Sequence, residues 1–174
     1  ALSRTGVRIV TYIPNNAYLV FGDGAALSSL REWSTNSNYV QWDGEYIAAY
    51  RVDPAFNEAK KNKLLAAATR TEFSRVADKN RPQDFDQVIV QLVYSATTNQ
   101  NTISTIQQQL GAQSIVRNTI DYGYVNIVAK LPAGTSSETI AKNLATRPDV
   151  VSIQPYMTPH KMDERQNMII AGNL

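Results

Sequence analysis

The alternation of hydrophobic and polar positions between residues 84 and 162 predicts one small domain. Four segments have the alternating, β-branched pattern of strands, and two have apolar residues at the three-to-four spacing of an amphipathic helix. In chain order they predict strand, helix, strand, strand, helix and strand at residues 87–94, 98–110, 114–119, 122–130, 136–145 and 150–156. We therefore expect an α+β fold: a ferredoxin-like βαββαβ module with an antiparallel sheet and helices on one face.

A similar order of segments begins about a hundred residues earlier. It predicts two short strands, a helix and two extended segments at residues 7–12, 17–21, 24–33, 39–42 and 46–52. Tyr18 aligns with Tyr124 at an offset of 106, and Asp53 aligns with Asp163 at an offset of 110. Order and spacing therefore predict tandem ferredoxin-like modules. Because only residues 1–5 precede Gly6, the first module lacks its leading strand and helix.

The predicted domain boundaries follow changes in composition. An Asp-Pro pair is followed by a segment rich in Ala, Lys, Glu and Leu, which are good helix formers. We expect an incomplete first module at 1–54, a helical linker at 55–83, the complete second module at 84–162 and a connector helix at 163–174. The missing strand would leave backbone groups of the first module unpaired. We therefore expect a strand from upstream sequence, a retained cleaved peptide or a neighbouring molecule.

Composition narrows the chemistry. The 174 residues are 43% hydrophobic and 18% charged with a net charge of +2, which fits a globular chain and does not favour nucleic acid. Without cysteine there are no disulfides or thiolate metal sites, and His160 is the only histidine, so we expect no catalytic triad, no metal and no cofactor. No apolar run approaches the roughly 18 residues of a membrane-spanning helix, so we expect no membrane partner.

One motif bears on RNA. The βαββαβ order also occurs in RNA-recognition domains, whose third strand stacks bases on aromatic residues. Tyr122-Gly123-Tyr124-Val125 matches the middle of that third-strand pattern. However, Asp121 stands near the position of a phosphate contact, Ile127 replaces the last aromatic residue, and the first strand has no aromatic residue. An RNA-binding, RRM-like module is therefore the weaker alternative, and we expect no nucleic-acid partner.

Two runs resemble the N-terminal prosegment of a group of bacterial secreted subtilisin-like serine proteases. The first extends from Gly6 through Tyr12-Ile13-Pro14-Asn15-Asn16-Ala17-Tyr18-Leu19-Val20 and continues in Val40-Gln41-Trp42-Asp43-Gly44-Glu45-Tyr46 and Tyr50-Arg51-Val52-Asp53-Pro54. The second is the tail at residues 161–173, which is similar to the connector before the catalytic domain in that group. The resemblance covers nearly the whole chain.

The resemblance implies a pro-region that acts as intramolecular chaperone and inhibitor of a cognate subtilisin-like catalytic domain. It also implies secretion, with a signal peptide upstream. Related prodomains lay the open face of their sheet on two enzyme helices and run the following segment through the active-site cleft. An extended, proline-punctuated segment suits that role, and the predicted inhibitory tail is Tyr156, Met157, Thr158, Pro159, His160, Lys161 and Met162. The alternative is a structural or assembly protein built from the same modules by strand complementation.

Overall fold

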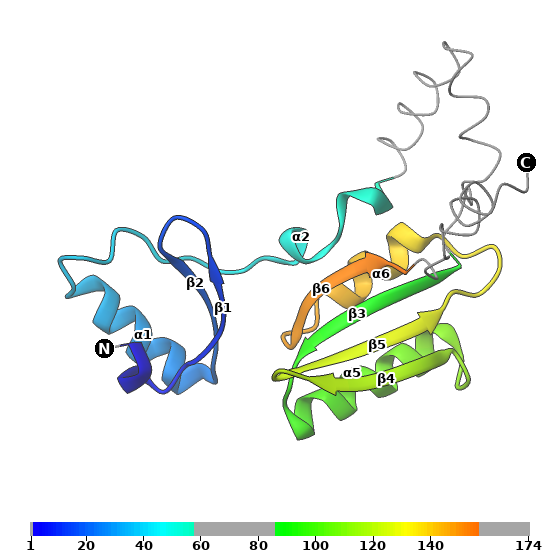
Figure 1. Ribbon diagram of the computed structural model, residues 1–174, viewed down its shortest axis with the longest axis horizontal. Helices are drawn as coiled ribbons and strands as arrows, with labels where there is room; N and C mark the ends of the chain where they lie inside the picture. The colour runs from blue at the N-terminus through cyan, green and yellow to red at the C-terminus, as the bar shows by residue number, and fades with distance from the viewer. Residues whose placement is uncertain (1, 58–85, 157–174) are drawn as a thin grey trace, which may run out of the picture.

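The computed structural model describes residues 2–57 and 86–156 (Figure 1). These residues form a two-stranded and a four-stranded antiparallel sheet together with helices. The chain is therefore of the α+β class, and its four-stranded part is compatible with a ferredoxin-like arrangement. The predicted linker and connector helix lie almost entirely outside the described residues, so these domain boundaries and the tandem organisation stay predictions.

Residues 86–156 form a complete βαββαβ unit, which we call the second module. Its elements are β3 Gln87–Val93, α5 Ala96–Leu110, β4 Ile115–Asp121, β5 Tyr124–Lys130, α6 Ser137–Ala145 and β6 Val150–Pro155. All six elements predicted here are confirmed, with each end within two residues of its expected position. The strand order is β4-β5-β3-β6. Both helices lie on one face of the sheet, behind it in Figure 1.

Local signals explain where these elements begin and end. The β4–β5 hairpin turns through Tyr122 and Gly123, whose φ angles of 48° and 83° match the positive values that a two-residue hairpin turn needs. Gly111 ends α5 at a φ of 104°, in a region that L side chains rarely adopt. At the start of α6 the Ser136 hydroxyl accepts a hydrogen bond from the Thr139 amide at 3.3 Å. Local turn and cap residues therefore determine where these elements of the second module begin and end.

The core of the second module lies between the sheet and its two helices. The strand register places Val88 opposite Ala129 and Leu92 opposite Val125, and all four side chains are buried. Helices α5 and α6 bury Ile106, Leu110, Ile140, Ala141, Leu144 and Ala145 against them. Each large aliphatic residue buried in this way contributes about 1.5–3 kcal/mol, so this core dominates the stability of the described chain.

Residues 2–45, which we call the first region, contain a hairpin and a helix. Strands β1 Arg8–Ile13 and β2 Ala17–Phe21 pair antiparallel, after the short 3-10 helix η1 Leu2–Thr5 and before α1 Gly24–Thr35. Asn15 and Asn16 form the turn at φ angles of 72° and 61°. The Asp23 carboxylate accepts a hydrogen bond from the Ala26 amide at 2.9 Å and caps α1. The strands predicted at 7–12 and 17–21 and the helix predicted at 24–33 are confirmed.

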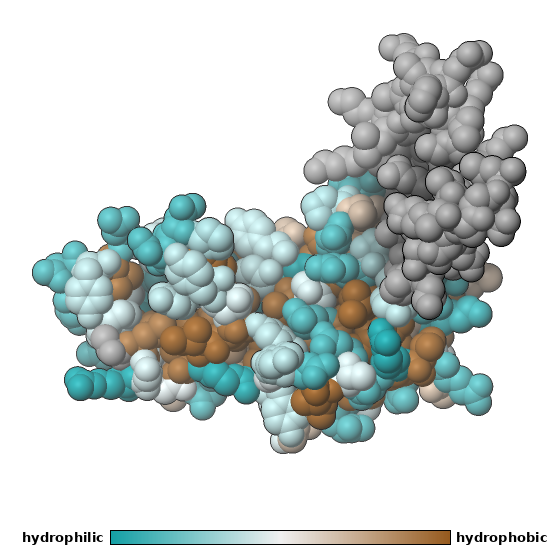
Figure 2. Space-filling model, viewed as in Figure 1, coloured by the Kyte–Doolittle hydropathy of each residue, from teal (hydrophilic) through white to brown (hydrophobic). Residues whose placement is uncertain are grey.

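The first region has almost no core. Among residues 2–47, Val7 and Ala26 are the only buried apolar side chains. Figure 2 shows apolar residues at the surface of this region, at the left of the view. A two-stranded hairpin without a packed face is marginally stable in water, so this region depends on contacts beyond its own elements.

Two sequence expectations for the first copy are wrong. Residues 39–42 belong to no strand, and the segment expected to be extended at 46–52 contains α2 Ala48–Arg51. In the second module β6 pairs with β3, but the described part of the first region offers no counterpart of β3. Among residues 2–57 and 86–156, residues 39–42 therefore have no neighbouring strand. Paired alanines favour a helical turn at 48–49, and the 3-10 helix η2 Pro54–Phe56 follows.

Candidate functional site

The predicted inhibitory tail begins at the end of β6, and Tyr156 is the part of it that the structure describes. The Tyr156 amide donates to the Gln87 carbonyl at 3.0 Å, which continues the β3–β6 ladder by one residue. Arg117 Nη2 donates to the Tyr156 hydroxyl at 3.1 Å, and the guanidinium carbon lies 5.5 Å from the ring centroid. These contacts fix Tyr156 at the end of the β3–β6 ladder. Met157, Thr158, Pro159, His160, Lys161 and Met162 lie outside the described residues.

The sheet face opposite the helices, which we call the outer face, lies beside this exit point. Gln91 pairs with Asn126 on one side and Ser152 on the other, and its amide donates to Asn126 Oδ1 at 3.0 Å. Ile89 lies two residues before Gln91 on the same face of β3, opposite Gln154. Because successive strand residues alternate between faces, Tyr156 belongs to the same face as Gln154. The outer face therefore combines partly exposed amides with aliphatic groups and ends at the tail.

A buried polar network joins α5 to the turn before β6. The fully buried carboxylate of Asp149 accepts from Thr102 Oγ1 at 2.7 Å and from Asn99 Nδ2 at 2.8 Å. The Asn99 amide also donates to the Val93 carbonyl, and Arg147 Nε donates to Thr102 Oγ1 at 3.2 Å. Buried polar groups are costly without partners, and here each oxygen of the carboxylate has one. The network positions β6, and through it Tyr156.

Residues 46–57, which we call the strap, run along the edge of the second module. Val52 forms a parallel bridge with Ile153, and the Asp53 amide donates to the Ile153 carbonyl at 2.9 Å. Phe56 is 2% exposed and belongs to the core of the second module. The sequence did not predict this attachment, because the change in composition after Asp53-Pro54 placed Val52 and Asp53 in the first copy and Phe56 in the linker. The available signal was Phe56, a large aromatic residue at the start of an alanine-rich segment.

Polar contacts hold the start of the strap as well. Arg51 Nη1 donates to the carbonyls of Arg147 at 2.6 Å and Ala145 at 3.1 Å, next to the C-terminus of α6, where a cation is favourable. The Tyr46 hydroxyl donates to the Val151 carbonyl at 3.2 Å. Burial raises the pKa of Tyr46, and the positive charge of Arg51 opposes that rise. The hydroxyl therefore stays protonated, and able to donate, through the physiological pH range.

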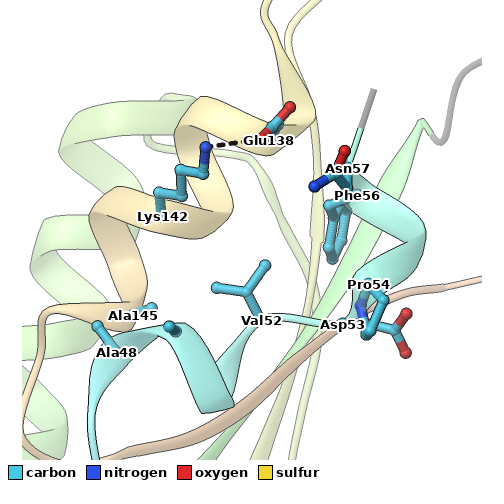
Figure 3. A pocket seen from close by; sticks show the side chains of 10 residues that line it. Ala48, Val52, Asp53, Pro54, Phe56, Asn57, Glu138, Lys142 and Ala145 are labelled. Carbon is cyan, nitrogen blue, oxygen red and sulfur yellow. Dashed lines mark ion pairs between the residues drawn. The ribbon is translucent and has the colours of Figure 1, made fainter. Parts of the chain in front are cut away.

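A cavity of about 420 Å³ lies between the strap and α6 (Figure 3). Its wall is mainly apolar, from Val52 and Phe56 on one side and Ala145 on the other. Lys142 Nζ and Glu138 Oε1 form an ion pair at 2.6 Å along α6. Asp53 belongs to the lining as well, so the cavity combines a mainly apolar wall with three charged side chains.

Residues 2–57 and 86–156 can also be checked for a metal site, a membrane-spanning helix and the RNA-like motif. In these ranges no three His, Cys, Asp or Glu side chains lie together in a way that could hold a metal. None of the helices described there is long and apolar enough to cross a membrane. Tyr122, part of the RNA-like motif, lies in the β4–β5 turn and is 99% exposed rather than set on the sheet. The Tyr124 hydroxyl donates to the Val10 carbonyl at 2.8 Å.

Comparison with known proteins gives one match. A family model described as a domain of unknown function (DUF8729) matches residues 1–47, which cover the hairpin and α1 of the first region. No curated protein and no solved structure matches the chain.

Proposed function

We propose that this chain is the pro-region of a secreted subtilisin-like serine endopeptidase, where it inhibits the catalytic domain and assists its folding. In this proposal the chain consists of two inhibitor-type ferredoxin-like modules in tandem, the first of them incomplete. The second module binds the enzyme through its outer face, and residues 156–162 occupy the active-site cleft as a substrate-like strand. The two sequence runs that resemble such prosegments support the proposal.

The observation that carries the proposal is the junction between the outer face and the tail. Both helices cover the opposite face, and on the outer face Gln91 and Asn126 stay partly exposed, whereas Val128 is buried. The backbone bond from Tyr156 to Gln87 and the contact with Arg117 hold Tyr156, the first residue of the proposed tail, at the end of the β3–β6 ladder. A partner seated on the outer face would therefore lie next to the start of the tail.

Two linked contacts explain how modest surfaces would give tight inhibition. The outer face offers amide groups at Gln91 and Asn126 beside the aliphatic Ile89, a mixture typical of protein–protein interfaces. A tail tethered to a docked module enters the cleft at a high effective concentration, which raises affinity by roughly 10²–10⁴-fold over either contact alone. The same docked surface would hold helices of a folding catalytic domain in place.

The test is inhibition of the cognate catalytic domain by purified chain. We expect the full chain to inhibit at about nanomolar concentration, in the range typical of protease–inhibitor pairs. Deletion of residues 157–174 should weaken inhibition by about 100-fold or more, because the linked second contact is lost. Asn126→Arg should also weaken inhibition, since it places a long charged side chain on the outer face.

The matched control for the outer face is Ile120→Arg. Ile120 is 64% exposed on β4 and belongs to the opposite face of the sheet from Asn126. Ile120→Arg should leave inhibition unchanged. Equal inhibition by the full chain and by the tail deletion, with both proteins folded, would refute the inhibitory role of the tail. No inhibition by either protein would refute the proposed function.

A further inference from the structure

Sheet edges are sites where another chain can add a strand, and folded proteins usually block them with charges, bulges or covering segments. The two sheets formed by the described residues have four outer edges, at β1, β2, β4 and β6. The edge of β6 is covered by the strap, through the Val52 bridge and the amide of Asp53. The edge of β4 has a register shift between Ile115 and Arg117 and charged residues at Arg117 and Asp121.

The edge of β1 is also modified. Its register shifts between Ile9 and Thr11, which marks Val10 as the extra residue. The Val10 carbonyl accepts a hydrogen bond from the Tyr124 hydroxyl of the second module, and Arg8 Nη2 donates to the Tyr94 carbonyl. The β1 edge is therefore irregular and engaged with the second module.

The outer edge of β2 has none of these features. Its sequence, Ala17–Phe21, contains no charge and no proline, and a regular ladder with β1 runs from Leu19 to Ala17. Within residues 2–57 and 86–156 no other strand pairs with β2. Tyr18 is 54% exposed. In the second module the corresponding strand, β5, pairs on both edges, with β4 and β3.

We propose that the outer edge of β2 pairs with β2 of a second copy of this chain, which joins the two hairpins into one four-stranded antiparallel sheet. A two-fold axis at Leu19 makes the strand its own partner, as a closed dimer requires. It places Tyr18 opposite Val20 of the second copy and Ala17 opposite Phe21 of the second copy. An aromatic residue opposite a β-branched residue is a favourable cross-strand pair, and no like charges meet.

A second copy suits this edge for two reasons. The edge carries no charge, so two identical strands meet without repulsion, and the chain as a whole has a net charge of only +2. The incoming strand also takes the place, beside β2, that β3 takes beside β5 in the second module. The dimer depends on contacts of the first region alone, so it does not rest on the proposed inhibitory function.

The absence of cysteine from the chain makes a direct test available. Residues directly opposite in an antiparallel pair have Cα atoms about 4.5–5.5 Å apart, within the roughly 4.4–6.8 Å that a disulfide spans. Full-length Leu19→Cys should therefore form a disulfide-linked dimer under mild oxidation. The control is Ile120→Cys, which places a thiol on the exposed β4 edge and should remain largely uncrosslinked. Equal crosslinking of the two variants would overturn the proposal.

Charge substitution at the axis gives a second test that does not rely on oxidation. Light scattering of the unmodified chain should show a fraction of dimer that increases with protein concentration. Leu19→Lys alone and Leu19→Glu alone should lose the dimer, since like charges meet at the axis, and an equimolar mixture should restore it. Restoration also shows that both variants fold. A monomer at every concentration, or a mixture that stays monomeric, would overturn the proposal, even if another strand-forming peptide bound to the monomer.

Discussion

The first region and the second module contain the same kinds of local structure but differ in what holds them together. Each has a hairpin with positive φ angles in its turn and a helix whose N-cap accepts a backbone hydrogen bond. In the second module the central strand β3 contributes Val88, Val90 and Leu92, all completely buried. The first region has no counterpart of β3 among its described residues. Local signals therefore form hairpins and helices, but a core needs the central strand that joins them.

The strap follows the first region in the chain but packs as part of the second module. Residues 46–57 follow the first region directly, yet their backbone bridges Ile153 and their aromatic residue Phe56 enters the core of the second module. The strap thus adds one more extended segment beside the four strands of the second module, at the edge of β6. The first region gains only a few polar contacts with the second module, such as the bond from Arg8 to the Tyr94 carbonyl.

Separating the first region from the second module should give the largest difference in stability. A fragment of residues 46–174 should unfold in one cooperative urea transition, because it keeps the whole core and the strap. A fragment of residues 1–45 at low concentration should show no cooperative transition, since an isolated hairpin with one helix is marginal in water. Circular dichroism during urea titration measures both. A cooperative transition in the shorter fragment would break the comparison.

Truncation of the strap's anchor should give the next largest effect. Phe56→Ala in the full chain should lower the free energy of unfolding by about 3–5 kcal/mol, as other buried aromatic truncations do. The control Tyr50→Ala lies in the same strap but is 66% exposed, and it should change stability by less than about 0.5 kcal/mol. Urea denaturation followed by fluorescence compares them. Similar midpoints for the two variants would show that the strap does not belong to the core.

Removing a polar anchor from the second module or from the first region should give a smaller difference in stability. Asp149→Ala removes the acceptor of Asn99 and Thr102 inside the second module and should cost about 1–3 kcal/mol. Asp23→Ala removes the N-cap of α1 in the first region, where helix caps contribute about 1 kcal/mol. Because the first region lacks a core, that loss should appear as local fraying near α1 in hydrogen exchange. The outcome that contradicts this view is an Asp23→Ala change that lowers the global unfolding midpoint as much as Asp149→Ala.

Sequence patterns predicted the elements of the second module well because each has its own local signal. Alternating apolar residues mark β3, a glycine ends α5, and Ser136 caps α6. The same reasoning failed at 39–42 and 46–52, where extended segments were expected. A strand pattern produces a strand only beside another strand, and whether one is present is not a property of the segment itself. The role of Tyr156 in a candidate site stays a prediction, and its partner Arg117 was not named from the sequence.

The sequence by itself determined the α+β class, the order of elements in the second module, the hairpin of the first region and the helix that follows it. These depend on turn residues, caps and hydrophobic periodicity, which act over a few neighbouring residues. Only the tertiary structure decided that Phe56 enters the second module's core, that Asp149 is buried among neutral donors, and that β2 keeps an unpartnered edge within the described residues. Those outcomes depend on which distant surfaces meet, because burial and strand pairing are gained only when two segments come together.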